Sequence, residues 1–290
     1  DKYYPISTSK ICRKLSNIEY DCFIHKVCTL RGCTKDKKDR KDNKDLHTTS
    51  LDACLEYYKK MGYDDKLANT IEMAKKFAMS DIIPQYTMSE KDQRGGGRPI
   101  ATPTLETKIG NLVIEKPEQA IGSFTDNNIL VSGKHKLLTQ SITYKKLLEK
   151  GYRNKNKFVF QCTEDQSKFS ENDNTRKYYT YIKNNTLLPI NIRRLQYDCI
   201  KKMIGREHLV KRIPTNLKES HLRKYLNEEK NGISAIIGWP QGMLNNISTS
   251  IHSISDYWIT YAFNKAYNKN ICTEGLVHSD DSWFAIACDS

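Results

Sequence analysis

The chain has 290 residues, of which 38% are hydrophobic and 10% aromatic, enough for one large or two modest domains with a buried core. No run approaches the roughly 18 consecutive apolar residues of a membrane span, and the N-terminus lacks the layout of a signal peptide, so we expect a soluble, intracellular protein. The formal net charge of +13 suits either a polyanionic partner or a solubilising surface, and charge alone does not choose between them.

The nine cysteines are scattered and lack paired Cys-x-x-Cys spacing, which argues against both a disulfide framework and a zinc ribbon. Reduced thiols are therefore expected. One cluster has irregular spacing, so we treat its members as ordinary buried residues and leave metal binding by them open: Cys22, His25, Cys28 and Cys33.

The first 90 residues predict two helices and a charged loop. Residues 35–45 alternate charge sign without an apolar residue, which indicates a solvated, mobile loop. A helix is expected to begin at Ser50 and to end at Gly62. A second helix follows, with an apolar stripe made of Leu67, Ile71, Ala74 and either Phe77 or Ala78.

The middle of the chain predicts a special loop, a helix and a strand. Residues 91–100 are cationic and contain three consecutive glycines, which implies an unusual backbone. The next helix is predicted near 135–150 and closed by Gly151, with its stripe at Leu137, Leu138, Ile142 and Leu147. The run 157–162 predicts a largely buried strand that delivers Asp165 just past its end.

Residues 175–228 are predicted to be mostly helical, with Pro189 and Pro214 as interruptions. A loop at 238–242 then precedes a long helix. Its apolar residues recur at helical spacing and predict a core-facing stripe: Ile247, Ile251, Ile254, Trp258 and Tyr261.

Residues 276–288 predict two apolar strands joined by a tight turn, with Asp280 and Asp281 at its tip. Because the chain stops directly after a core strand, we expect it to be a fragment of a longer protein. An acid pair at a turn is usually only solvated, and an Asp after a strand often caps a helix. Here, however, rigid strands hold two like charges together, and divalent cations neutralise such a pair.

With Asp165 and a glycine-containing loop before a long helix, the order of these parts matches two-metal phosphoryl transfer. The segments resemble motifs F, A, B and C of the large polymerase protein of segmented negative-strand RNA viruses, the bunyavirus group. The fingertip motif F is resembled by Lys91-x-Gln93-x-Gly95-Gly96-x-Arg98-x-Ile100, and motif A by Asp165-Gln166-Ser167-Lys168-Phe169-Ser170. Motif B is resembled by 241–245 with Ser248, Thr249, His252 and Ser253, and motif C by Ser279-Asp280-Asp281.

The resemblance covers about residues 91–288 and, within the group, points to a plant-infecting, tospovirus-like enzyme. Ser-Asp-Asp in place of Gly-Asp-Asp points away from positive-strand replicases. Two departures are Phe169, where Trp is usual, and Pro99, where a Glu is frequent. The second departure puts any role of that Glu in doubt.

The resemblance implies a role for individual residues. Asp165 and Asp280 would ligate two Mg²⁺ or Mn²⁺ ions, and Asp281 would complete or tune the shell. The implied nucleotide-binding residues are Lys91, Arg94 and Arg98 on the triphosphate, together with Lys168, Gln241, Gly242, Asn245 and Ser248. Of these, Asn245 or Ser248 would contact the ribose 2′-hydroxyl. A solvated basic loop and a surface charge are the alternatives for the cationic residues.

The implied fold is an α/β right-hand polymerase with fingers and palm, a small antiparallel sheet and flanking helices, and without a thumb. Residues 1–90 would be a helical fingers-side region and 91–155 the fingertip and fingers. Residues 156–290 would be the palm, with an inserted helical fingers segment at 175–237.

The implied activity is RNA-directed RNA synthesis for viral replication and transcription, and the isolated fragment is expected to be inactive. The implied partners are RNA template and product, nucleoside triphosphates, the rest of the polymerase with its thumb and endonuclease region, and the viral nucleoprotein, in host cytoplasm and virion. Two alternatives stay open: a non-catalytic RNA-binding module, and another two-metal nucleic-acid enzyme.

Overall fold

The computed structural model describes residues 70–91, 98–131, 133–165, 170, 172–235, 237–240, 242–267 and 271–289. The predicted loop 35–45, the helix from Ser50 to Gly62 and the cysteine cluster with His25 lie outside these residues. The predicted mixed α/β class, with a small antiparallel sheet and flanking helices, is confirmed. Among the helices of the described residues, none combines the length and the apolar character needed to span a bilayer.

Two compact units can be distinguished, and each is treated separately. The three-stranded unit draws on the described residues of 115–169 and 244–290, and the five-stranded unit on those of 70–114 and 170–243. Helix α6 (Leu105–Gly122) contributes residues to both.

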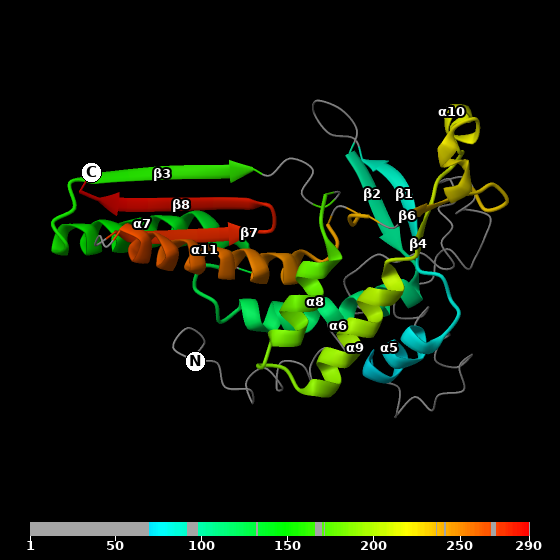
Figure 1. Cartoon of the computed structure of the whole chain (residues 1–290), viewed down its shortest axis with the longest axis horizontal. Coiled ribbons are helices and arrows are strands. Elements are labelled where there is room, and N and C mark those ends of the chain that lie inside the picture. The colour runs from blue at the N-terminus through cyan, green and yellow to red at the C-terminus, as the bar shows by residue number, and fades with distance from the viewer. Residues whose placement is uncertain are drawn as a thin grey trace. The chain divides into compact units, whose positions relative to one another are not determined.

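The sheet of the three-stranded unit is antiparallel, in the order β3-β8-β7 (Figure 1). Its strands are β3 (Phe158–Asp165), β7 (Cys272–His278) and β8 (Asp281–Cys288). The predicted hairpin is thereby confirmed. Helix α7 (Lys136–Arg153), which follows the short helix η3 (Gly133–His135), contacts β7 and β8, and helix α11 (Asn245–Tyr267) contacts β7.

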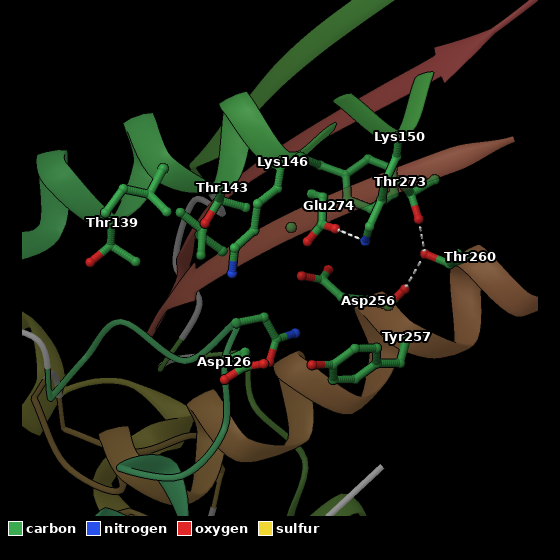
Figure 2. A pocket seen from close by; sticks show the side chains of 15 residues that line it. Asp126, Thr139, Thr143, Lys146, Lys150, Asp256, Tyr257, Thr260, Thr273 and Glu274 are labelled. Carbon is green, nitrogen blue, oxygen red and sulfur yellow. Dashed lines mark hydrogen bonds and ion pairs between the residues drawn. The ribbon is translucent and has the colours of Figure 1, made fainter. Parts of the chain in front are cut away.

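The two helices cover opposite faces of this sheet. Successive side chains of a strand point to opposite faces, so the contacts of each helix identify the face that it covers. On one face, Trp283 and Ala285 of β8 are buried in a cluster with Leu147 of α7 and Leu276 of β7. On the other face, Thr273 of β7 meets α11, as shown by the hydrogen bond between its Oγ1 and that of Thr260, 2.5 Å long (Figure 2).

Strand β3 is exposed, so the prediction of a largely buried strand at 157–162 is wrong. Phe158, Val159 and Phe160 are 50%, 37% and 59% exposed. The reason lies in the strand order, since β3 forms an edge of the sheet while α7 and α11 contact the other two strands. An apolar run alone does not distinguish a central strand from an edge strand.

The predicted helix near 135–150 is confirmed as α7, but it does not end at Gly151 and continues to Arg153. A Cβ built on Gly151 would lie 3.0 Å from the Cβ of Ala287, so this glycine permits close packing on β8. Of the predicted stripe, only Leu147 is buried, whereas the other members are exposed: Leu137, Leu138 and Ile142.

The predicted long helix is confirmed as α11, but its core-facing stripe is correct only at the start. Ile247 is fully buried, whereas Ile254, Trp258 and Tyr261 are 42%, 67% and 59% exposed. Helical spacing identifies a face of a helix, but the tertiary structure determines how far along that face the helix is covered.

The five-stranded unit has the strand order β2-β1-β4-β6-β5. Strands β1 and β4 are parallel, and the other neighbours are antiparallel. The bounds are β1 (Gln85–Lys91), β2 (Arg98–Pro103), β4 (Arg206–Leu209), β5 (Leu226–Asn227) and β6 (Gly232–Ala235). Pro99 and Pro103 stand on the edge strand β2, where the missing N–H need not cost a bond between strands.

The helices of this unit are α5 (Thr70–Met79), α8 (Thr175–Asn184), α9 (Ile190–Met203), α10 (Thr215–Lys218) and η4 (His221–Tyr225). Ala74 and Phe77 of the predicted second helix are buried in α5, although Ile71 is 40% exposed. Pro189 and Pro214 directly precede α9 and α10, as interruptions should. Beyond Met203, the mostly helical prediction is wrong, because short strands pair with partners far away in the sequence.

Candidate active site

The hairpin turn between β7 and β8 consists of Ser279 and Asp280, whereas Asp281 is the first residue of β8. The turn therefore carries one acid and the strand end carries the other. In the ladder between β3 and β8, Asp281 lies directly opposite Asp165. Paired residues share a face of a sheet, so the fold brings all three predicted acids to one end of this sheet.

Ser279 has a φ of +60°, a conformation in which glycine is favoured at the first central position of a two-residue hairpin turn. Helix α11 holds this residue at three atoms. The Ser279 N–H donates to Thr249 Oγ1 at 3.0 Å, and its hydroxyl donates to Asn245 Oδ1 at 3.1 Å. The carbonyl oxygen lies 3.2 Å from His252 Nδ1, which donates in the matching tautomer.

These contacts tie the turn with Asp280 to successive turns of α11. Ser279 is 8% exposed and Thr249 is fully buried, so water competes little for these hydrogen bonds. Next to the turn, His278 Nδ1 lies 4.0 Å from Asp281 Oδ2. The result is a rigid placement of the turn against the helix.

The start of α11 is fixed by an acid from α6. Glu115 accepts hydrogen bonds from the N–H groups of Asn246 and Ile247 at 3.0 and 3.3 Å, and from Asn246 Nδ2 at 2.9 Å. These N–H groups have no partner within a helix. The negative carboxylate also complements the positive end of the helix dipole.

Among its described residues, the loop before α11 contains three left-handed ones: Gly238 with a φ of +60°, Gly242 with a φ of +85° and Leu244 with a φ of +54°. Glycine adopts such a φ without the steric cost that a side chain brings. Leu244 adopts the same region of φ although it has a side chain. Such a conformation is energetically costly, and residues that adopt it cluster at functional sites. Of the other predicted motif B residues, Ser248 is 3% exposed, and Gln241 lies outside the described residues.

Two of the predicted fingertip residues lie on the paired strands β1 and β2. Lys91 ends β1, Arg98 begins β2, and the two are direct partners across the strands. Arg94 and Lys168 lie outside the described residues. The structure therefore brings two of the four predicted cationic residues together at the level of the backbone.

Carboxylates are the ligands that Mg²⁺ and Mn²⁺ prefer in proteins. The backbone register of Asp165 and Asp281, with Asp280 in the adjoining turn, fits such a donor set. Within the side chains that the structure describes, no cluster of three His, Cys, Asp or Glu residues forms a ready metal site. The side chain of Asp165 is not among them.

Sequence reasoning assigned no role to Arg206, which is 1% exposed in the five-stranded unit. Its Nη2 donates to the carbonyl oxygens of Ile237 and Gly238 at 3.0 and 2.7 Å. The guanidinium lies 5.0 Å from the ring centroid of Trp239, and the backbone N–H of Trp239 donates to Ser170 O at 2.7 Å. Arg206 thus holds the loop that leads to Gly242 near the end of the predicted motif A.

Two pKa shifts follow from this burial. Desolvation lowers the pKa of the Arg206 guanidinium. Desolvation, and then the charge of Arg206, lower the pKa of His208 to about 4. His208 is therefore neutral at pH 7, and its Nε2 accepts the bond from Arg206 Nε at 3.2 Å. No pattern in the sequence pointed to the burial of Arg206, because its partners Ile237 and Gly238 are about 30 residues away in the chain.

Comparison with protein families gives one match. The model described as bunyavirus RNA dependent RNA polymerase matches residues 64–290, well over half of the chain. The match includes every predicted catalytic and nucleotide-binding residue. A comparison with curated proteins gives no match.

Proposed function

Since the chain belongs to the bunyavirus RNA-dependent RNA polymerase family, we propose that its three-stranded sheet is the palm of a two-metal RNA polymerase. In this proposal the five-stranded unit and its helices belong to the fingers of a right-hand fold. The observation that carries the proposal is the register that sets Asp165 opposite Asp281, with Asp280 in the turn held by α11. RNA and nucleoside triphosphates are the partners that membership of this family implies.

The residues of the candidate site would hold the metal ions and position the turn. Asp165, Asp280 and Asp281 would hold two Mg²⁺ or Mn²⁺ ions. When bound, these ions would lower the pKa of the attacking 3′-hydroxyl and neutralise charge on the leaving pyrophosphate. Thr249 and His252 would act as positioning residues, because they contact Ser279, which precedes Asp280 in the turn.

The fingertip would bind the triphosphate. Lys91 and Arg98 stand on opposite strands at the base of residues 92–97, so cations on both sides of the tip would face the same ligand. Arginine can contact phosphate oxygens through two N–H groups at once. Arg94, Lys168 and Gln241 join this set by resemblance, and Gly242 allows close approach of the backbone to a ligand.

Selection of ribose would fall to Asn245 or Ser248. The Asn245 side chain accepts the Ser279 hydroxyl, and Ser248 is almost fully buried. A role in binding the 2′-hydroxyl therefore requires a rearrangement when nucleotide binds, or a contact through the Asn245 amide nitrogen. The thumb, the endonuclease region, the nucleoprotein, the tospovirus-like host range and a location in host cytoplasm and virion are further parts of this proposal.

The test is templated incorporation of labelled ribonucleotides by the full polymerase that carries this chain, with Mg²⁺ or Mn²⁺. The isolated 290 residues are expected to be inactive. We expect Asp165→Asn and Asp280→Ala each to reduce incorporation by at least about 100-fold, because loss of a metal ligand removes several kcal/mol of transition-state stabilisation. RNA binding should be retained.

A matched control is Glu164→Gln. Glu164 precedes Asp165 on β3 and faces the other side of the sheet, where it accepts a hydrogen bond from Ser282 Oγ at 3.3 Å. This variant should keep incorporation within about threefold of the wild type, a change of less than about 1 kcal/mol. Undiminished synthesis by Asp165→Asn and Asp280→Ala would remove these residues from the metal site. RNA binding with no synthesis by the wild type under any metal would favour a non-catalytic RNA-binding module.

A further inference from the structure

Arg206 is a buried charge without a carboxylate partner. It stands on β4, is 1% exposed, and takes part in none of the ion pairs that the described residues form. A buried arginine is costly to desolvate, and an apolar side chain of similar volume is often neutral or stabilising at such a position. Stability of the fold therefore gives little reason for an arginine here, and its contacts indicate a further use.

The side chain holds two consecutive carbonyl groups. Its Nη2 donates to Ile237 O at 3.0 Å and to Gly238 O at 2.7 Å, and its Nε donates to His208 Nε2 at 3.2 Å. All of these residues belong to the five-stranded unit. The guanidinium is planar and presents its N–H groups in a fixed arrangement, so these bonds fix the direction in which both carbonyl groups point.

The residues that follow these carbonyl groups are held as well. The backbone N–H of Trp239 donates at 2.7 Å to the carbonyl oxygen of Ser170, the last residue of the predicted motif A. The Trp239 ring is 3% exposed, and its centroid lies 5.0 Å from the Arg206 guanidinium and 5.9 Å from the Tyr178 ring centroid. Pro240 comes next, and its ring fixes φ. The approach to Gly242 is therefore held at each successive residue.

A tight turn follows directly, at residues 240–243. The N–H of Met243 donates to Pro240 O at 3.1 Å, and Gly242, at the third position, has a φ of +85°. These are the features of a type II turn, whose third position needs a positive φ and favours glycine. In the proposed function, Gly242 is the point at which a ligand approaches the backbone closely. The direction of this turn depends on the chain that enters it, and hence on Arg206.

We propose that Arg206 is a positioning residue for nucleotide addition: by holding the carbonyl groups of Ile237 and Gly238, it keeps the turn at 240–243 in the orientation that binds the incoming nucleotide. The inference rests on the proposed function and adds to it a residue outside the predicted motifs. Arg206 is buried and acts through the backbone. Its loss therefore weakens binding in the ground state and the transition state alike, which raises KM for the nucleotide and leaves kcat nearly unchanged.

The test is incorporation of labelled ribonucleotide by the full polymerase that carries this chain, with KM and kcat measured for the wild type and for Arg206→Met. Methionine is apolar, flexible and of comparable length, so it can stay buried without an unpaired charge. We expect KM for the nucleotide to rise at least about tenfold, because a hydrogen bond from a charged donor contributes about that factor or more. The kcat should stay within about threefold of the wild type.

A merely structural role predicts the opposite pattern. Fewer folded molecules lower the apparent kcat in proportion and leave KM unchanged. The matched control is Lys202→Met. Lys202 is a half-buried cation of α9 in the same unit, and its Nζ donates to the carbonyl oxygen of Ser80. This variant also removes a cation from a backbone carbonyl, but from one outside residues 237–243, so KM should not change.

A second variant, Arg206→Lys, covers the case in which Arg206→Met does not fold, which its melting temperature shows. Lysine keeps the charge but replaces the planar group by a single nitrogen atom, so KM should rise at least about threefold. An unchanged KM in a folded Arg206→Met or Arg206→Lys overturns the inference, and so does a fall in kcat alone.

The role of Arg206 and the proposed function can fail separately. When the wild type incorporates nucleotide and Asp280→Ala does not, an unchanged KM in the Arg206 variants overturns only the role of Arg206. When the wild type makes no RNA under any metal, the proposed function fails, and the role of Arg206 fails with it.

Discussion

Ser279 pays a conformational cost that its contacts with α11 offset. A side chain in the left-handed region costs roughly 1 to 2 kcal/mol relative to glycine. The hydroxyl bond to Asn245, 3.1 Å long, is available to serine and not to glycine. Compared with glycine, serine has a less favourable backbone conformation here, but its hydroxyl links the turn to the helix.

Two substitutions separate the backbone cost from the contribution of the hydroxyl bond. Ser279→Ala keeps the positive φ and loses the hydroxyl bond, so it should lower the free energy of unfolding of the chain by about 1 kcal/mol. Ser279→Gly loses the same bond but relieves the backbone, so it should stay within about 0.5 kcal/mol of the wild type. Denaturant unfolding measures both. Equal losses in the two variants would show that the backbone cost is absent.

At the scale of elements, α11 depends on a cap that its own sequence does not supply. The residues directly before it, Met243 and Leu244, have no side-chain acceptor for the first N–H groups. Glu115, more than a hundred residues earlier in the chain, accepts those bonds instead. The helix that holds Ser279 is therefore anchored by α6.

Removing this cap should destabilise the chain. We expect Glu115→Ala to lower the free energy of unfolding by about 1 to 2 kcal/mol, the usual value of a helix cap together with its charge. Glu115→Gln keeps an acceptor oxygen and should lose less than half of that amount. Denaturant unfolding of the two variants provides the measurement. An unchanged midpoint in Glu115→Ala would mean that the cap is not needed.

At the scale of the whole molecule, the buried Asp256 of α11 makes the free energy of unfolding depend on pH. The pKa of Asp256 is raised from 3.8 to about 6, so the folded chain binds this proton more tightly than the unfolded chain does. Asp256 therefore causes no loss of stability below about pH 4. The loss grows as pH rises and is complete above about pH 6, where it is no more than about 3 kcal/mol.

Asp256→Asn should abolish this part of the pH dependence. We expect the variant to be more stable than the wild type at pH 7 and equal to it at pH 4, because a neutral amide resembles the protonated acid. The free energies of unfolding of the wild type and the variant are measured between pH 4 and 7.5. In the difference between them, the contributions of the other titrating groups cancel. A constant difference over this range would contradict the assignment.

The sequence by itself determined the elements that have strong local signals. The α7 and α11 helices and the 276–288 hairpin were predicted correctly, because spacing and turn residues act within a few positions. The order of Asp165, Gly242 and Asp280-Asp281 also indicated the polymerase family, which the match over 64–290 confirms. Local chemistry and order along the chain are sufficient for these conclusions.

Only the tertiary structure decided what each element contacts. The exposure of β3 and of Trp258 follows from strand order and helix placement, which no short window of sequence contains. The Glu115 cap, the bonds of Thr249 to the turn and the burial of Arg206 join residues that are far apart in the chain. The burial of Asp256 arises in the same way, because α11 and β7 enclose this side chain only once they have packed together.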